Sequence, residues 1–350
     1  MTKPFLILKL LFLILLLYSP YANVKAQQDC LINLERAEKL FDQGIIEEIP
    51  ELLTECLKSG FSARNKIRAQ RLLILAYLFD NRVEEAETIM KDFLNDNPEY
   101  EIQPGDPAEF TTLFSSYRTY RHFSMGLFIG TNVTNAIMLE HYGPYNPDID
   151  KGGFSMTTPE YLFGASANIF LTDNLELNIE SIFSRNSFEF ENLQYGFAEI
   201  YKKETLQRLE FPVSVSYDLL RNQWKPYLRL GASYGLILSA STNYRRSFLN
   251  TASEESSPIP IESPELDIKD RRSNGTFNAI LGGGIKYRIP RGYFFFDLRY
   301  SLGLSKLVNP ETRWDQETIF QYYYADGNFQ LDHFSFSIGY RYSFYKSVKK

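Results

Sequence analysis

Charged side chains of both signs occur at alternate positions in several segments of the longer, C-terminal part of the chain. Glu176 and Glu180 are four residues apart, and Asp297 and Arg299 are two apart, so each pair shares one face of an extended segment. Charges removed from water persist only when they are paired. The sequence therefore predicts an internal network of ion pairs made by Glu176, Glu180, Glu210, Arg229, Lys286, Arg288, Asp297, Arg299, His333 and Arg341.

Two interpretations of this network follow from its chemistry. We favour a structural plug, in which carboxylates and cations neutralise one another and hold neighbouring segments together. The alternative is a path for protons or ions along the same side chains. Conductance across a planar bilayer would support the path, and electrical silence would count against it.

No other group of residues has the composition of a catalytic or metal site. The histidines, His122, His141 and His333, are far apart in the sequence, and neither H-E-x-x-H nor G-x-S-x-G occurs. Gly282–Gly284 lacks the following Lys-Ser or Lys-Thr of a phosphate-binding loop. The acidic run 146–150 is similar to a calcium loop, but its glycine comes one place late and no Glu closes it. We therefore expect no enzymatic activity, no cofactor and no metal.

The elements that must position the charges are extended segments with a period of two. In the last of them Phe334, Phe336 and Ile338 alternate with Ser335 and Ser337, which indicates a β-strand with one aromatic face. A tilted strand of about nine residues is long enough to cross the hydrocarbon layer of a membrane. The segments are Phe123–Val133, Tyr161–Leu171, Leu175–Phe183, Leu209–Tyr217, Leu228–Leu238, Ala279–Ile289, Phe294–Leu304 and Phe334–Phe344.

The connections between these segments alternate in length, as they do where short periplasmic turns face longer outer loops. Turns are expected at 172–174, 219–225 and 290–292, and loops at 134–160, 190–203, 242–273 and 308–328. The predicted fold over residues 123–350 is an all-β transmembrane barrel of eight antiparallel, up-and-down strands. Side chains fill a barrel of about eight strands, so we expect no open pore.

The N-terminal part has a different pattern. Residues 5–18 form an apolar run too short to span a membrane, which predicts a signal peptide over residues 1–26. Between residues 27 and 100 apolar residues recur at helical spacing and predict a small all-α domain of helical hairpins in the periplasm. Residues 101–122 lack sustained periodicity and are expected to form a linker.

The chain has only two cysteines, which excludes a disulfide-dense scaffold. Cys30 begins the first expected helix, and Cys56 lies near the end of the helix that follows. A turn near Gly44 brings both residues to the same end of the hairpin. In an oxidising periplasm we therefore expect a Cys30–Cys56 disulfide.

The charge balance limits the class of partner. The full chain has a formal net charge of -6 and no basic block, which argues against nucleic acid as a partner. Residues 27–122 contain 11 basic and 18 acidic residues, so much of the negative charge lies in the helical part. A partner of this part is expected to present a basic surface.

The order of these features is similar to that in a known group of proteins. The signal peptide, the helical hairpins, the linker sequence Asp106–Phe110 and the glycine-rich alternating strands resemble outer-membrane β-barrel proteins of Bacteroidota, with a barrel like the PorT-like class. Leu73, Tyr77, Ala86 and Pro98 have offsets that resemble a tetratricopeptide repeat. The resemblance implies an integral outer-membrane protein, folded by the barrel-assembly machinery and sometimes associated with protein secretion and gliding. It supplies no functional residues.

The resulting hypothesis is a non-enzymatic anchor or adaptor in the outer membrane, acting in envelope assembly or protein secretion. The filled barrel would contact outer-membrane lipid, and residues 29–97 would bind a periplasmic or outer-membrane protein partner. The main alternative is a surface receptor or small-ligand binder that uses the long outer loops. An outer-membrane enzyme is a weaker alternative, because the sequence offers no catalytic constellation.

Overall fold

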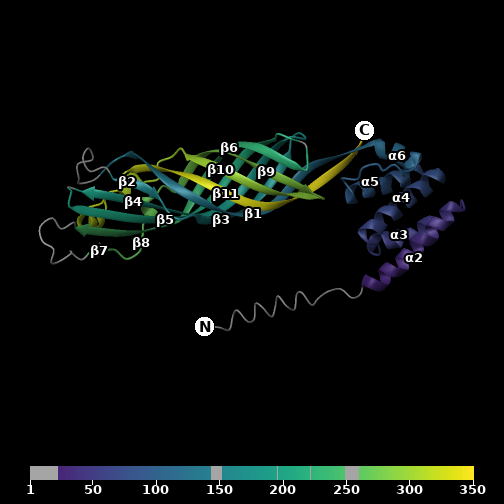
Figure 1. Cartoon of the computed structure of the whole chain (residues 1–350), viewed down its shortest axis with the longest axis horizontal. Coiled ribbons are helices and arrows are strands. Elements are labelled where there is room, and N and C mark those ends of the chain that lie inside the picture. Colours follow the sequence, from purple (N-terminus) through teal and green to yellow (C-terminus); the bar gives the residue numbers. More distant parts are fainter. Residues whose placement is uncertain (1–22, 143–151, 195, 221, 249–259) are drawn as a thin grey trace. The chain divides into compact units, whose positions relative to one another are not determined.

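A computed structural model describes residues 23–142, 152–194, 196–220, 222–248 and 260–350. The chain divides into two compact units (Figure 1). We call Met1–Tyr120 with Tyr345–Lys350 the helical unit and Arg121–Phe344 the strand unit. Residues 1–22 of the predicted signal peptide and the acidic run 146–150 lie outside the described residues.

The described part of the helical unit consists mainly of helices, with the first residues of one strand and the last residues of another. The helices are α2 (Asn23–Asp42), α3 (Ile49–Ser59), α4 (Ala63–Phe79), α5 (Val83–Asp96) and α6 (Ala108–Ser115). Gly44, between α2 and α3, has a φ of 78°, which glycine adopts without strain. Ser62 caps α4, because its hydroxyl accepts a hydrogen bond from the Asn65 backbone N–H. The expected cleavage site after Ala26 lies within α2.

The expected linker, residues 101–122, contains a packed element. Phe110 of α6 is fully buried and its ring centroid lies 5.5 Å from that of Phe93 on α5. Asp106, just before α6, forms an ion pair with Arg71 of α4, with Oδ1 2.5 Å from Nη2. The segment is therefore part of the helical unit, and the chain then enters a strand at residue 117.

The strand unit contains eight long strands that follow one another in a ring. They are β1 (Tyr117–Glu140), β3 (Glu160–Phe170), β4 (Leu175–Gln194), β5 (Ala198–Asp218), β6 (Trp224–Phe248), β9 (Gly275–Ile289), β10 (Gly292–Gly303) and β11 (Asn328–Lys349). Each strand neighbours the next in this order, and β11 neighbours β1. The sequence thus correctly predicts a mostly antiparallel sheet with a ring of eight strands after N-terminal helices.

Shorter elements lie in the connections. They are β2 (Gly153–Met156), which pairs with β4; β7 (Ile261–Glu262) and β8 (Leu266–Asp267), which pair with β6; a 3-10 turn at Lys269–Arg271 and another at Pro310–Thr312; and α7 (Gln316–Tyr322). These elements belong to the connections that are predicted to be loops. The turns at the other end of the strands, such as Pro290–Arg291 between β9 and β10, are short.

The two faces of each long strand differ as the alternation predicts. On β6, Leu228 and Leu230 are 59% and 67% exposed, whereas Arg229 between them is 2% exposed. The charged residue therefore faces the interior of the ring, and the leucines face outward.

The outward face changes composition partway along the strands. On β4 it is mostly apolar from Leu175 to Phe183 and polar or charged from Arg185 to Glu191. On β5 it is apolar over residues 209–217 and mostly polar over residues 199–207. Phe183 pairs with Leu209, so the change occurs at the same level on both strands. We call the outward apolar residues between the short turns and this change the apolar band. We call the parts of the strands beyond the change, toward the longer connections, the outer extension.

The outer extension corrects the predicted loops. Residues 190–203 and 242–273 are expected to be loops, but β4 continues to Gln194, β5 starts at Ala198 and β6 continues to Phe248. These segments were missed because the aromatic outward row that marks a membrane strand stops at the end of the apolar band. A β-bulge at Leu238 also shifts the alternation of β6 by one residue, since Ile237 pairs with Arg208 and Ser239 with Gln207.

Candidate functional site

Glu180 on β4 is the centre of a buried ionic cluster. Its Oε1 atom lies 2.8 Å from Arg229 Nη1, 3.1 Å from Arg341 Nη2 and 3.2 Å from Arg299 Nη2. Asp297 is the second carboxylate, with Oδ2 3.0 Å from Arg229 Nη2 and Oδ1 2.7 Å from Arg299 Nε. All five side chains are at most 4% exposed. We call them the central cluster.

The central cluster bridges the interior of the ring. Arg299 is on β10 and Glu180 on β4, and four steps separate these strands in either direction around the ring. Their contact therefore crosses the full width of the interior. Side chains that meet across a ring of about eight strands leave no continuous opening.

A second ionic group lies toward the end of the strands with short turns. Lys286 Nζ on β9 is 2.7 Å from Glu176 Oε1 and 2.6 Å from Asp218 Oδ1. Asp218 also lies 3.8 Å from the ammonium group of Lys225. Lys286 and Glu176 belong to the network predicted from the sequence, whereas Asp218 does not, although Asp218 has the same parity as Glu210 on β5.

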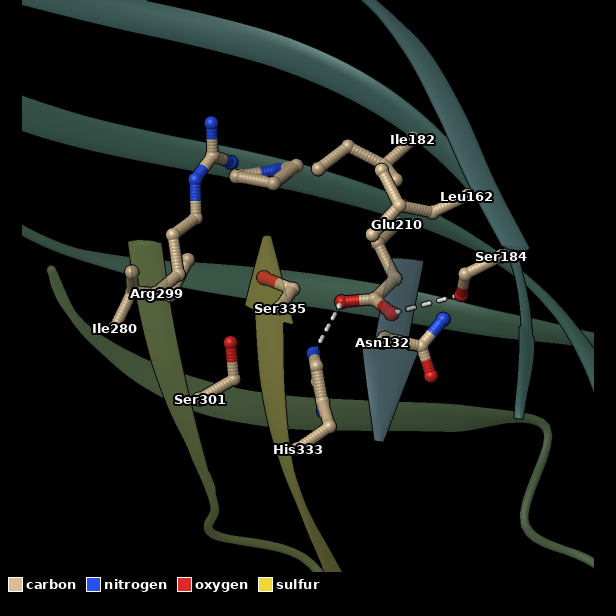
Figure 2. Close-up of a pocket in the computed structure, with 11 residues that line it drawn as sticks. Asn132, Leu162, Ile182, Ser184, Glu210, Ile280, Arg299, Ser301, His333 and Ser335 are labelled. Atoms are coloured by element: carbon tan, nitrogen blue, oxygen red, sulfur yellow. Dashed lines mark hydrogen bonds and ion pairs between the residues drawn. The ribbon is translucent and has the colours of Figure 1, made fainter. Parts of the chain in front are cut away.

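His333 and Glu210 line a small cavity on the other side of the central cluster (Figure 2). His333 Nε2 on β11 lies 3.7 Å from Glu210 Oε2 on β5, and Ser184 Oγ donates a hydrogen bond of 3.3 Å to Glu210 Oε1. Arg208 Nη1 lies 3.5 Å from the same carboxylate. The cavity has a volume of about 20 Å³, which holds about one water molecule. The group therefore fills the interior rather than opening it.

A third ionic cluster lies within the outer extension and is absent from the predicted network. Arg272 Nε is 2.5 Å from Glu204 Oε1, and Arg272 Nη1 is 2.9 Å from Asp326 Oδ2. Lys202 Nζ lies 2.8 Å from both Glu204 and Asp326. Lys202 and Glu204 continue the inward parity of β5, which is a signal that the sequence contains. Arg272 and Asp326 belong to connections without such a pattern, so sequence alone could not place them. We call these four residues the outer cluster.

Aromatic side chains surround the outer cluster. The ring of Tyr324 lies 4.8 Å from Lys202 Nζ, and the ring of Phe329 lies 5.6 Å from the Arg272 guanidinium carbon. Both rings are at most 1% exposed. The interior beyond the apolar band is thus filled by cations stacked on aromatic faces and paired with carboxylates.

The ring of strands with an outward apolar band and a charged, filled interior has the features of an outer-membrane barrel. The sequence matches the outer membrane protein beta-barrel domain family over residues 105–309. The chain belongs to this family. Its membership places the protein in the outer membrane, in contact with lipid.

Solved structures of outer-membrane proteins are similar to this barrel at low sequence identity. Ail of Yersinia pestis is 12% identical, with a TM-score of 0.29, over 64% of this chain and 100% of Ail. Outer membrane protein W of Escherichia coli is 16% identical, with a TM-score of 0.29, over 64% of this chain and 98% of that protein. Neisserial surface protein A is 13% identical, with a TM-score of 0.28, over 65% and 99%. No curated protein matches the sequence.

Arg288 differs from the other residues of the predicted network. The structure buries the other predicted residues, Glu176, Glu180, Glu210, Arg229, Lys286, Asp297, Arg299, His333 and Arg341. Arg288 has the inward parity of Lys286, but it is exposed, one residue before the end of β9. Near the end of a strand, parity no longer predicts burial, because the interior is open to solvent at the barrel's rim.

The helical unit of the barrel protein contains a disulfide between Cys30 and Cys56, whose Cα atoms are 5.6 Å apart. It joins α2 to α3. Gly60, at the end of α3, lies directly against it: a Cβ atom at this position would be 2.2 Å from Cys30 Sγ. A side chain at residue 60 is therefore incompatible with the disulfide as it stands.

A groove of about 380 Å³ lies among α3, α4 and α5. We call it the helical groove. Leu57, Leu73 and Ile89 provide its apolar lining, and Gln70 and Asp92 are among its polar residues. A cavity of this size is in the range that holds a ligand of a few residues.

Metal sites and membrane-spanning helices would each require a particular arrangement of residues in the described parts of the chain. Within them, no group of three or more His, Cys, Asp or Glu side chains has the arrangement of a metal site. Nor does any described helix combine the length and apolar character needed to cross a membrane.

Proposed function

We propose that this outer-membrane barrel is a non-enzymatic anchor that presents its helical unit to a basic protein partner in the periplasm. The observation that carries the proposal is the contact of Arg299 with Glu180 across the interior. A barrel bridged at its centre is suited to hold position rather than to conduct. The helical unit, with its disulfide and its groove, is then the part available for recognition.

The barrel's connections support a periplasmic location for the helical unit. Short turns face the periplasm and longer connections face outward in barrels of this kind. The helices precede β1, which starts at the end with short turns, so we place them in the periplasm. Export would use a signal peptide over residues 1–26.

We further propose that the protein belongs to the PorT-like barrels of Bacteroidota and acts in envelope assembly or protein secretion. The resemblance of its sequence features supports this assignment. The hairpin of α4 and α5 is proposed to be tetratricopeptide-like, since Leu73 and Ala86, which have the offsets of that repeat, are both fully buried.

Crosslinking in intact cells tests the adaptor function. The full protein is compared with a version lacking residues 29–97, and both are purified after crosslinking. We expect a defined set of periplasmic or membrane proteins to be lost with the helices. A partner set that is unchanged by the deletion would overturn the proposal.

A surface receptor is the second candidate function, and exposed aromatic residues support it. Trp314 and Phe320, in the connection between β10 and β11, are 57% and 75% exposed. The same crosslinking experiment with a Trp314→Ser, Phe320→Ser variant separates the two functions. Loss of partners in this variant alone would favour the receptor.

A further inference from the structure

The helical groove contains a buried hydrogen-bond acceptor that lacks a donor. Gln70 on α4 is only 3% exposed, and its side chain lines the groove. Its amide nitrogen donates a hydrogen bond of 2.9 Å to Asp96 Oδ2 on α5. Its carbonyl oxygen Oε1 is buried and has no hydrogen-bond partner among the described residues. Such an acceptor is unfavourable unless a ligand or water satisfies it.

The orientation of the Gln70 amide is determined by its neighbours. The Asp96 carboxylate only accepts hydrogen bonds when ionised, so the amide must turn its NH₂ group toward it. Lys66 Nζ lies 2.7 Å from the same Asp96 oxygen and keeps the carboxylate in place. Rotating the amide by 180° would bring two acceptors together. Gln70, which lines the groove, therefore has a carbonyl oxygen without an N–H donor in the described part of the chain.

The charge around the groove indicates which donor-bearing molecule fits. Asp92, on α5, is exposed at the groove and its carboxylate has no ion-pair partner in the described chain. The other charged lining residues are neutralised: Lys58 pairs with Glu55, and Lys66 pairs with Asp96. Leu57, Leu73 and Ile89 offer apolar contacts beside these polar groups. A basic, partly apolar chain with regularly spaced N–H groups matches all three features.

We propose that the helical groove binds an extended peptide segment of a protein partner. In this complex one peptide N–H donates to Gln70 Oε1, and a Lys or Arg side chain of the segment pairs with Asp92. Apolar side chains of the segment contact Leu73 and Ile89. This inference rests on the proposed adaptor function and names the chemistry that the partner must present.

A display library of random octapeptides, selected on the full-length protein in lipid nanodiscs, tests the proposal. We expect selected octapeptides to carry Lys or Arg at one fixed position. Their affinity should fall about tenfold for Gln70→Met, the size of one lost hydrogen bond, because Met has a similar shape but offers no carbonyl. Asp92→Asn should also weaken binding and should remove its dependence on salt.

Methylation of single peptide N–H groups makes the test specific. One N-methyl position should weaken binding about tenfold to the unmodified protein and have no further effect on Gln70→Met. Glu84→Gln, which removes an exposed acid from α5 outside the groove, serves as the matched control and should leave binding unchanged. Retention of the disulfide and of helical circular dichroism shows that each variant is folded.

The outcomes separate this inference from the adaptor function. If no octapeptide is enriched over empty nanodiscs, or if enriched ones bind Gln70→Met and Asp92→Asn as tightly as the unmodified protein, the groove is not a peptide site. Crosslinks that still depend on residues 29–97 would then leave the adaptor function standing on another surface of the helices. If the groove binds no octapeptide and no crosslinks depend on residues 29–97, both proposals are overturned.

Discussion

Arg299 on β10 reaches Glu180 on β4 with Nη2 3.2 Å from Oε1, although the two strands lie on opposite sides of the ring. His333 on β11 and Glu210 on β5 are also four steps apart in the ring and lie 3.7 Å from each other. The interior is therefore crossed at more than one level. Opposite walls are joined through buried ion pairs in addition to the hydrogen bonds between neighbouring strands.

Replacing the central carboxylate should strongly destabilise the barrel. Glu180→Gln leaves three buried guanidinium groups without their shared partner, and breaking a buried ion pair costs about 3–5 kcal/mol. Urea unfolding in lipid vesicles measures the change. Glu191→Gln, on the outward face of the same strand, is the control and should change stability by less than about 0.5 kcal/mol. Equal effects of the two substitutions would contradict a stabilising role for the cluster.

The protein should be electrically silent in planar bilayers. The contacts across the interior and the cavity of only about 20 Å³ beside His333 leave no path for hydrated ions. Current recordings after insertion should match those of the empty membrane over a range of voltages. Discrete current steps, present with the purified protein and absent from a mock preparation, would instead support the ion path.

Loss of the disulfide should loosen the helical unit and spare the barrel. Cys30 and Cys56 are separated by 26 residues, and closing such a loop contributes about 3.5 kcal/mol in the chain-entropy treatment. Hydrogen exchange of the full-length protein with Cys30→Ala and Cys56→Ala should show faster exchange in α2 and α3. Exchange in β4 and β5 is the internal control. Unchanged protection of α2 and α3 would show that packing alone holds the hairpin.

Gly60→Ala should destabilise the helical unit through contact with the disulfide. The added Cβ would lie 2.2 Å from Cys30 Sγ, so the backbone or the sulfur must move, at a cost of about 1–3 kcal/mol. In a Cys30→Ala, Cys56→Ala background the same substitution should cost less, because the sulfur is absent. Comparing the variants in a double-mutant cycle by thermal unfolding measures this coupling. Additive effects of the glycine and cysteine substitutions would show that the cost of Gly60→Ala does not come from contact with the disulfide.

The outer cluster should resist acid until well below neutral pH. Burial raises the pKa of the Asp326 carboxyl, but the charges of Arg272 and Lys202 outweigh it and hold that pKa well below its usual range. A lowered carboxyl pKa contributes stability above the unfolded value of about 3.9, and this contribution is lost as pH falls through the folded value. Hydrogen exchange at residues 269–273, corrected for intrinsic rates, should therefore stay slow from pH 7 to about pH 4 and rise below it.

Two variants check this pH dependence. Asp326→Asn should exchange faster at every pH, since Arg272 and Lys202 each lose a partner. Asp270→Asn, an exposed acid in the same connection, should behave as the unmodified protein does. Loss of protection near pH 6 in the unmodified protein would contradict the role of Asp326.

The sequence reveals the strands best where a membrane surrounds them. Between Leu175 and Phe183 the outward side chains must be largely apolar and the inward ones polar, so the alternation is readable. Glu180 and Arg229 could be identified from parity alone. Their specific partners could not, because ring order and strand register decide which charges meet.

Beyond the apolar band the alternation no longer identifies the strands or their inward residues. Water contacts the outward face there, so polar residues stand on both faces and period two loses its contrast. Arg272 and Asp326 come from connections in which no backbone period links position to direction. Arg288 is the opposite case. Its parity predicts burial, but the strand ends before the interior closes around it.

The apolar band also determines how deep the molecule sits in its bilayer. On β4 it runs from Leu175 to Phe183, which at about 3.3 Å per residue and a tilt of about 40° gives a height of about 23 Å. Charged side chains such as Arg185 and Glu189 follow immediately and resist immersion in hydrocarbon. Lipids with long acyl chains must therefore thin around the barrel, whereas short-chain lipids match it without deformation. This height is close to the apolar band of about 25 Å that is usual for outer-membrane barrels, and the level at which the outward face turns polar sets the depth of the protein in its bilayer.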